Sequence, residues 1–341
     1  MPPISPRHKL LITICKLLVV LGIIGYLLVQ IQKEDGFSRL VSEPKQWSYL
    51  LTAQAMILLA FSSSFVRWFL LVHGLQLNFH LRDSFRLGSL GFMFNQVAPG
   101  SVGGDLLKAV FIAREQPGKR TEAVATVLID RVIGLYAMLI IASLALSFAD
   151  SSGDVDGTIR TIRSVVWFAM TAGTVGLFVV LSPWATSSKT RQLAESLPLI
   201  GKTLLRLIDA LEIYRDRRGY LLGAFILALL THSFLVTAFW CIRCGLPVQG
   251  PTFLQNTSLV PVALVAGALP GMPGGLGVME GTLAYLYTTI GAAKSDGAIV
   301  AFTYRAMTYV VAAVGVCYYF AARKKVEGMI HDAEELAESI E

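Results

Sequence analysis

The chain has 341 residues, of which 54% are hydrophobic and 15% are charged, and its mean hydropathy is +0.62. A soluble domain carries about a quarter charged residues, so this composition excludes an ordinary soluble protein and indicates an integral membrane protein. The net charge of +6 is explained by basic loops on the cytoplasmic side of a membrane, and with no basic-aromatic module present, nucleic-acid binding is not expected.

Six apolar stretches are long enough to cross a hydrocarbon core of roughly 30 Å as helices. The first of them is too long for the apolar core of a signal peptide, so we expect a retained helix. The predicted spanning helices cover residues of about 10–31, 49–72, 121–148, 161–183, 220–242 and 297–322. The sequence therefore predicts an all-α polytopic membrane protein.

Two further apolar stretches, 84–112 and 252–291, are interrupted by the same signature, Pro-Gly-x-x-Gly followed within three residues by a carboxylate. The first copy is Pro99-Gly100-Ser101-Val102-Gly103-Gly104-Asp105, and the second is Pro273-Gly274-Gly275-Leu276-Gly277-Val278-Met279-Glu280. Inside a bilayer, broken backbone is tolerated only where protein or a water-filled cavity covers it. Paired interruptions in the two halves of a chain therefore point to a transporter's binding site. The alternative is that Gly and Pro only permit close helix packing.

The positions of the two copies predict an inverted repeat. If each interrupted stretch enters the membrane and returns to the same face, residues 1–150 and 151–325 each contribute three spanning helices and one re-entrant broken helix. An odd number of crossings turns the second half upside down. The distribution of loop charges agrees, because the acidic loop 149–160 then lies outside and the basic loops lie inside. We expect a multi-pass protein of the cell inner membrane with both termini cytoplasmic, including the acidic tail 326–341.

The connection 184–218 is long for a loop, and leucine and isoleucine recur in it at helical spacing between basic residues. This pattern predicts an amphipathic helix. It either lies on the inner membrane interface or packs on the protein itself as a linker helix.

Polar side chains flank both breaks. Asn95 precedes the first break, Asp105 and Lys108 follow it, and Glu280 follows the second. A half-helix that begins at a break presents unsatisfied amides and a positive dipole end, for which phosphate is a natural ligand.

Charges within the predicted spans are costly, so each is expected to face a partner or a wet cavity. Asp130 and Arg131 are adjacent and point roughly 100° apart on a helix, so they cannot pair face to face. Arg305 lies about eight residues into the last span and either neutralises Glu280 or offers its guanidinium to an anionic head group. Arg67, near the inner end of the second span, either faces such a partner or extends to the interface.

No nucleophile, metal-ligand or nucleotide-binding motif accompanies these charges. The four cysteines lie in apolar surroundings, and Cys241-x-x-Cys244 has no second pair of ligands. An enzyme is not expected, nor is a metal or a cofactor.

Together these residues resemble a known family. Asn95-x-x-x-Pro99-Gly100-x-x-Gly103-Gly104-Asp105-x-x-Lys108, Asp130-Arg131-x-x-Gly134 and Leu269-Pro270-x-x-Pro273-Gly274-Gly275-x-Gly277-x-x-Glu280-Gly281 are similar to the flippase-like family, the membrane region of lysylphosphatidylglycerol synthase/flippases. The family often has Arg at the position of Lys108 and Glu at that of Asp130, and both differences keep the charge. The similarity covers residues of roughly 10–325. It implies lipid translocation or handling, and not lysyl transfer, because no stretch is suited to the cytosolic aminoacyl-transfer domain.

The leading hypothesis is a lipid translocator that moves a polar head group, of a phospholipid or a polyprenyl-phosphate lipid, between leaflets. The predicted substrate-binding residues are Asn95, Pro99, Gly100, Gly103, Gly104, Asp105, Lys108, Asp130, Arg131, Pro273, Gly274, Gly275, Gly277, Glu280 and Arg305. The alternatives are a membrane scaffold that recruits a lipid-modifying enzyme or a glycosyltransferase, and a lipid-acting membrane enzyme. The spacing of Gly267, Gly271 and Gly275 suits either a homodimer contact or packing within the chain.

Overall fold

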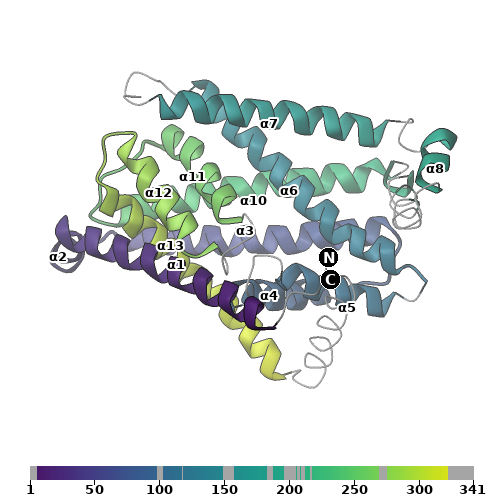
Figure 1. Ribbon diagram of the computed structural model, residues 1–341, viewed down its shortest axis with the longest axis horizontal. Coiled ribbons are helices and arrows are strands. Elements are labelled where there is room, and N and C mark those ends of the chain that lie inside the picture. The colour runs from purple at the N-terminus through teal and green to yellow at the C-terminus, as the bar shows by residue number, and fades with distance from the viewer. Residues whose placement is uncertain are drawn as a thin grey trace.

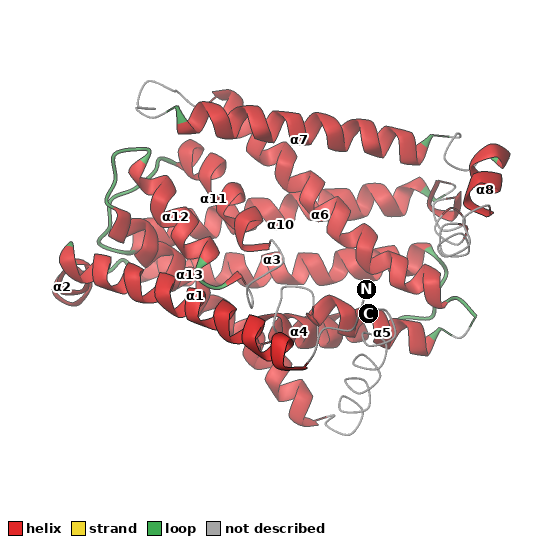
Figure 2. Cartoon of the chain, viewed as in Figure 1, coloured by secondary structure: helices red, strands yellow, loops and turns green. Residues whose placement is uncertain are grey.

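The computed structural model describes residues 6–97, 103–116, 118–148, 157–182, 187–195, 205, 208, 212–215, 217–268 and 275–321. Within these residues the regular structure is helical and no strand occurs (Figure 2). Pro99, Gly100, Pro273, Gly274 and the tail 326–341 lie outside the described residues.

Six long helices correspond to the six predicted spans. They are α1 (Pro6–Lys33), α3 (Trp47–Gly74), α6 (Arg120–Phe148), α7 (Thr158–Leu181), α10 (Arg218–Gly245) and α13 (Lys294–Ala321). Five of them, α3, α6, α7, α10 and α13, are long and apolar enough to cross a membrane. The prediction of an all-helical, multi-pass membrane protein is confirmed.

The remaining helices are shorter. They are α2 (Gly36–Ser42), α4 (Leu81–Val97), α5 (Gly103–Glu115), α8 (Ser188–Glu195), α11 (Phe253–Ala268) and α12 (Val278–Thr288). Four of them, α4 with α5 and α11 with α12, occupy the two stretches that carry the glycine-proline signatures. The signatures therefore separate paired helices, as the helix-breaking properties of Gly and Pro require.

Helices α4 and α5 form an antiparallel pair, here called the first hairpin. At one end of the pair, Gln116 Nε2 donates a hydrogen bond of 2.6 Å to the carbonyl oxygen of Asn78. At the other end, Gly104 packs directly on Gly91. We call the end beside the break the tip and the opposite end the base.

Helices α11 and α12 form the second hairpin in the same way. Near its tip, Gly275 packs against the backbone of Gly267. At its base, Gly250 lies against the ring of Tyr287. Gly267 and Gly275 pack on each other, so these two glycines serve contacts within the chain, and Gly271 lies outside the described residues. The predicted homodimer remains a prediction.

The bases of the two hairpins lie at opposite ends of the long helices. Helices α3 and α10 run antiparallel. Just before α3, the amide of Gln46 donates a hydrogen bond to the carbonyl oxygen of Gly245 at the end of α10. Just before α10, the hydroxyl of Tyr214 donates one to the carbonyl oxygen of Leu71 near the end of α3. The first base follows the end of α3, and the second follows the end of α10. Figure 1 accordingly shows α4 and α5 toward one end of the bundle and α11 and α12 toward the other.

Helix α13 runs along both hairpins. Gly297, near its start, packs on Ala284 of α12, and Gly315, near its end, packs on the backbone of Ser89 in α4. Arg305 lies between these two contacts. Helix α13 therefore positions the charged side chain of Arg305 between the two hairpins.

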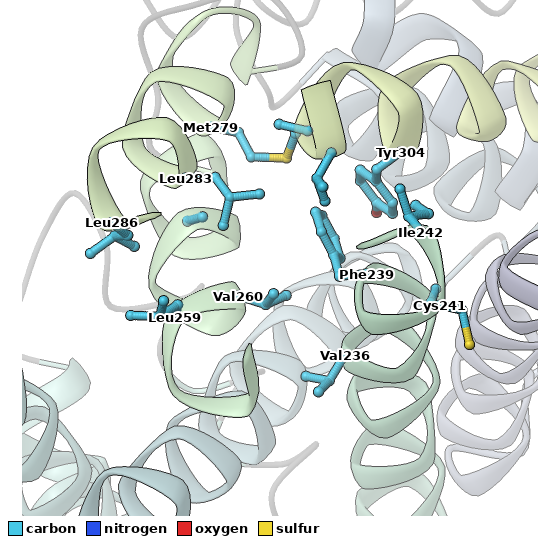
Figure 3. Close-up of a cluster of buried hydrophobic side chains, with 14 of the residues drawn as sticks. Val236, Phe239, Cys241, Ile242, Leu259, Val260, Met279, Leu283, Leu286 and Tyr304 are labelled. Carbon is cyan, nitrogen blue, oxygen red and sulfur yellow. The ribbon is translucent and has the colours of Figure 1, made fainter. Parts of the chain in front are cut away.

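The largest buried cluster holds the second hairpin against α10 and α13 (Figure 3). Phe239 of α10 stacks on Tyr304 of α13, with ring centroids 4.2 Å apart. Val260 and Leu283, from the two arms of the hairpin, pack into the same cluster and are fully buried. Close packing of these side chains, which drives association between helices in a membrane, fixes the second hairpin beside Arg305.

Most of the connection 184–218 lies outside the described residues. Its described parts include α8 and the buried residues Ile208 and Tyr214. The hydroxyl of Tyr214 donates a 2.6 Å hydrogen bond to the carbonyl of Leu71 in α3. At this point the connection packs on the protein itself, which is the second of the two arrangements that its pattern allows.

Candidate functional site

The tip of the first hairpin is held by two glycines and an asparagine. A Cβ atom on Gly104 would overlap the carbonyl oxygen of Gly91, so the arms approach each other as closely as backbone permits. Asn95 accepts a 2.8 Å hydrogen bond from the amide of Gly104 at its side-chain oxygen. This bond satisfies one of the free amides at the start of α5. The predicted ligand-binding residue Asn95 therefore makes a bond within the hairpin.

At the tip of the second hairpin, Glu280 has the corresponding task. Its Oε2 accepts a 2.8 Å hydrogen bond from the amide of Gly277, which caps the start of α12. Gly277 has a φ of 81° and Gly275 a φ of 66°, a conformation that favours glycine. The second signature therefore needs glycine at both positions and a carboxylate three residues after Gly277.

Arg305 connects the two tips. Its Nε donates a 2.8 Å hydrogen bond to Oε1 of Glu280, and its Nη1 donates one of 3.3 Å to the side-chain oxygen of Gln96. Gln96 is next to the last residue of α4, and Glu280 lies in the first turn of α12. Glu280 is fully buried, and 8% of Arg305 is exposed. We call Gln96, Glu280 and Arg305 the Arg305 junction.

The acid of the first signature pairs in the same manner. Nη2 of Arg131 in α6 donates a 2.7 Å hydrogen bond to Oδ1 of Asp105, and Nε of Arg131 lies 2.6 Å from Oδ2 in the same ion pair. Asp105 precedes Arg131 by 26 residues, and Glu280 precedes Arg305 by 25. In each half, the acid at the start of the second hairpin arm thus pairs with an arginine of the following long helix.

Asp130 points away from Arg131, as their adjacency on a helix requires. It accepts two hydrogen bonds from Arg67 of α3, 2.6 Å from Nε and 3.0 Å from Nη2. Gly134, one turn after Asp130, faces the same guanidinium, since a Cβ there would lie 3.3 Å from Nη1 of Arg67. Arg67 is 5% exposed, so it takes the buried partner and does not extend to the interface.

Lys108 adds a third cation to this region. Its Nζ lies 3.8 Å from Oδ1 of Asp105 and 5.4 Å from the centre of the Trp68 ring. Its side chain crosses α4 at Gly91, where a Cβ would lie 2.9 Å from the Cε of Lys108. We call Arg67, Asp105, Lys108, Asp130 and Arg131 the charge cluster.

The structure thus arranges the predicted residues in two groups, the charge cluster on α3, α5 and α6 and the Arg305 junction at the tips. Two residues of these groups, Arg67 and Gln96, were not predicted from the sequence as binding residues. The only signal for Arg67 is a charge within a predicted span, and the only signal for Gln96 is its position beside a break. Gly103, Gly104, Gly275 and Gly277 form the backbone of the breaks.

A cavity of about 260 Å³ lies away from both groups. Helices α6, α7 and α11 line it with aliphatic side chains, including Met138, Val165 and Pro261, and with Thr161. None of the predicted binding residues lines this cavity. Helix α7 packs along α6 on one side of it and is otherwise largely exposed (Figure 1).

Comparison with family models identifies the family of this chain. The model of the lysylphosphatidylglycerol synthase TM region, a membrane domain associated with lipid-related functions, matches residues 13–315. Comparison with curated proteins and with solved structures found no match. The matched residues include both hairpins, the charge cluster and the Arg305 junction. The chain therefore belongs to the lysylphosphatidylglycerol synthase TM region family, as its motifs predicted.

Proposed function

We propose that this protein moves a lipid with a polar head group between the leaflets of the cell inner membrane, without catalysing a chemical reaction. The observation that carries the proposal is the contact of Arg305 with both hairpin tips, through Glu280 on one side and Gln96 on the other. A buried arginine that joins two broken helices is suited to bind a polar group and to respond to it.

The lengths of the hairpin arms support a re-entrant arrangement. Helices α4, α5, α11 and α12 have 17, 13, 16 and 11 residues. At 1.5 Å per residue, the longest arm measures about 25 Å, and a hydrocarbon core measures roughly 30 Å. Each hairpin would therefore enter the membrane from the face at its base and end inside it. With the bases at opposite ends of the bundle, one hairpin would enter from each face.

The matched ion pairs support an inverted repeat. Asp105 with Arg131 and Glu280 with Arg305 have the same order along the chain and nearly the same spacing. Each half also has one close glycine contact beside its break, Gly91 with Gly104 or Gly267 with Gly275. Rocking of one repeat against the other would open the tips to each face in turn, with both termini cytoplasmic.

The Arg305 junction supplies the moving part of this mechanism. A head group that reaches the tips would compete with Gln96 for Nη1 of Arg305, since a 3.3 Å bond to a neutral amide is weaker than a bond to a negatively charged phosphate or carboxylate. The bond from Nε to Glu280 would keep the guanidinium in place. The head group would cross between the tips while the hydrocarbon chains remain in the surrounding lipid.

The test is lipid movement in proteoliposomes that contain only this protein. Fluorescent head-group-labelled lipids, one anionic phospholipid, one cationic phospholipid and one polyprenyl phosphate sugar, are placed in both leaflets. The fluorescence that membrane-impermeant dithionite removes is then measured. We expect the wild-type protein to expose the inner-leaflet pool of at least one lipid class, and Glu280→Gln to slow this at least tenfold.

Protein-free liposomes and heat-denatured protein serve as controls. If the folded wild-type protein moves none of the lipids faster than protein-free liposomes, the translocator proposal is wrong. An equal rate for Glu280→Gln would remove the Arg305 junction from the mechanism.

A further inference from the structure

We propose that the charge cluster is a binding site for one anionic phosphate group of a lipid, with Lys108 as its main ligand. The proposal deepens the proposed function by naming the substrate class, an anionic phospholipid or lipid phosphate. It assigns the phosphate to the first hairpin and α6, whereas the Arg305 junction acts at the tips.

The first argument is the charge balance of the cluster. Arg67, Lys108 and Arg131 supply three positive charges, and Asp105 and Asp130 supply two negative ones. Each carboxylate already pairs with its own arginine through both of its oxygens. One positive charge, that of Lys108, is therefore left over. The Arg305 junction, in contrast, has one arginine and one carboxylate and is balanced.

The second argument is the state of the Lys108 ammonium. Its Nζ lies 3.8 Å from Asp105, too far for a hydrogen bond, and it makes no hydrogen bond within the part of the chain that the structure describes. Only 14% of the Lys108 side chain is exposed. An ammonium so removed from water, with its three donors unused, is costly unless an anion occupies the site.

A second donor in the cluster is also unused. Nη1 of Arg67 is buried and has no hydrogen-bond partner among the described residues. The side chain of Arg67 is 6% exposed, so bulk solvent reaches it poorly. Together with Lys108, the cluster therefore contains cationic donors on both α3 and α5 that no described residue accepts, as expected of an anion-binding site.

The surroundings of Arg131 favour a lipid over free phosphate. The side chain of Arg131 is 54% exposed, so the cluster is open at this point. Its neighbours on the same helix, Leu128, Val132 and Leu135, are exposed by 58%, 53% and 48%. These apolar side chains lie in one of the helices that can cross a membrane, where hydrocarbon chains would cover them. A lipid whose phosphate lies at Lys108 and whose hydrocarbon chains cover this face would contact both the charged residues and the apolar ones.

The experiment measures binding and needs no transport. The full chain, in nanodiscs of zwitterionic lipid, is titrated with dihexanoyl phosphatidylglycerol, dihexanoyl phosphatidylcholine or inorganic phosphate, and its Tm is followed. We expect phosphatidylglycerol to raise the Tm in a saturable manner and phosphatidylcholine to leave it unchanged. Stabilisation by inorganic phosphate without stabilisation by phosphatidylglycerol would overturn the assignment to a lipid. No stabilisation by either anion would overturn the site.

Lys108→Met separates a binding role from a structural one. This variant leaves two positive and two negative charges, so we expect its Tm without ligand to equal or exceed that of the wild type. We also expect its apparent affinity for phosphatidylglycerol to fall at least tenfold. A lower Tm with unchanged affinity would show that Lys108 only supports Asp105, and would contradict the proposal. Lys108→Arg keeps the charge and is expected to keep most of the affinity, and it decides the matter if Lys108→Met does not fold.

Lys294→Met is the matched control. Lys294 also lies over an aromatic ring, 4.8 Å from the centre of Tyr26, but it donates a hydrogen bond to the Tyr26 hydroxyl and is partly exposed. We expect this variant to bind phosphatidylglycerol as the wild type does. Binding at the charge cluster without lipid movement would disprove the proposed function alone. Lipid movement without such binding would disprove this inference alone.

Discussion

Arg305 and Glu280 form a buried ion pair in which Nε of the arginine lies 2.8 Å from Oε1 of the glutamate. The second oxygen of Glu280 caps Gly277 at the break before α12. One carboxylate therefore fixes both the geometry of the break and the position of the arginine that contacts the other hairpin. A change in the bonding of Arg305 can in this way reach the backbone of the second tip and the side chain of Gln96 at the first.

The closest backbone contact of the first hairpin is predicted to be essential for its fold. Gly104→Ala places a methyl group onto the carbonyl of Gly91, and backbone atoms cannot move aside as side chains do. We expect a loss of stability of about 3 kcal/mol, the upper end of the usual cost of overpacking. Thermal unfolding of the purified variant in nanodiscs measures it. Gly176→Ala in α7 is the control, because nothing lies within 4 Å of its Cβ position. Equal Tm values for the two variants would contradict the described tip.

The ion pair of Arg67 and Asp130 gives a second prediction. Arg67→Met leaves Asp130 buried without its partner, and breaking such a pair costs about 3–5 kcal/mol. The double variant Arg67→Met/Asp130→Leu removes both charges and should recover most of that stability. A double-mutant cycle on unfolding free energies measures the coupling. Additive effects of the two single variants would mean that the two side chains do not interact.

Asn95 and Gln96 are adjacent amides with different contacts, so they allow a third prediction. Asn95 caps Gly104 within the first hairpin, and Asn95→Ala should lower the stability by about 1 kcal/mol. Gln96 bonds to Arg305, and Gln96→Ala should change the rate of lipid movement with little loss of stability. Unfolding and lipid movement are measured on both variants. If Gln96→Ala loses stability and keeps the wild-type rate, the contact with Arg305 is only structural.

Much of the helical architecture could be predicted from the sequence because its signals are local. An apolar stretch long enough for a bilayer predicts a helix wherever it occurs, and Gly and Pro mark the breaks in 84–112 and 252–291. Glu280 and Arg305 could be paired because both are charges in apolar surroundings with few other partners.

The partners of Asp130 and Arg305 in other parts of the chain could not be predicted. Arg67 precedes Asp130 by 63 residues, and Gln96 precedes Arg305 by 209. These contacts depend on how α3 packs on α6 and how α13 packs on α4, and a single sequence records neither. Asn95 shows a related difficulty, since an amide beside a break serves equally well as a ligand or as a cap.

The most direct test of this account compares two ion pairs of α13, one made by its Arg305 and one by its Asp296. Arg305 holds Glu280 at the tips, and Arg39 of α2 holds Asp296 in the first turn of α13, each at 2.8 Å. The measurement is the rate of lipid movement in proteoliposomes for Arg305→Ala and Arg39→Gln, normalised to folded protein. The account predicts at least a tenfold slower rate for Arg305→Ala and a rate near that of the wild type for Arg39→Gln. A wild-type rate for folded Arg305→Ala, or an equal loss in both variants, would contradict a role for the Arg305 junction in translocation.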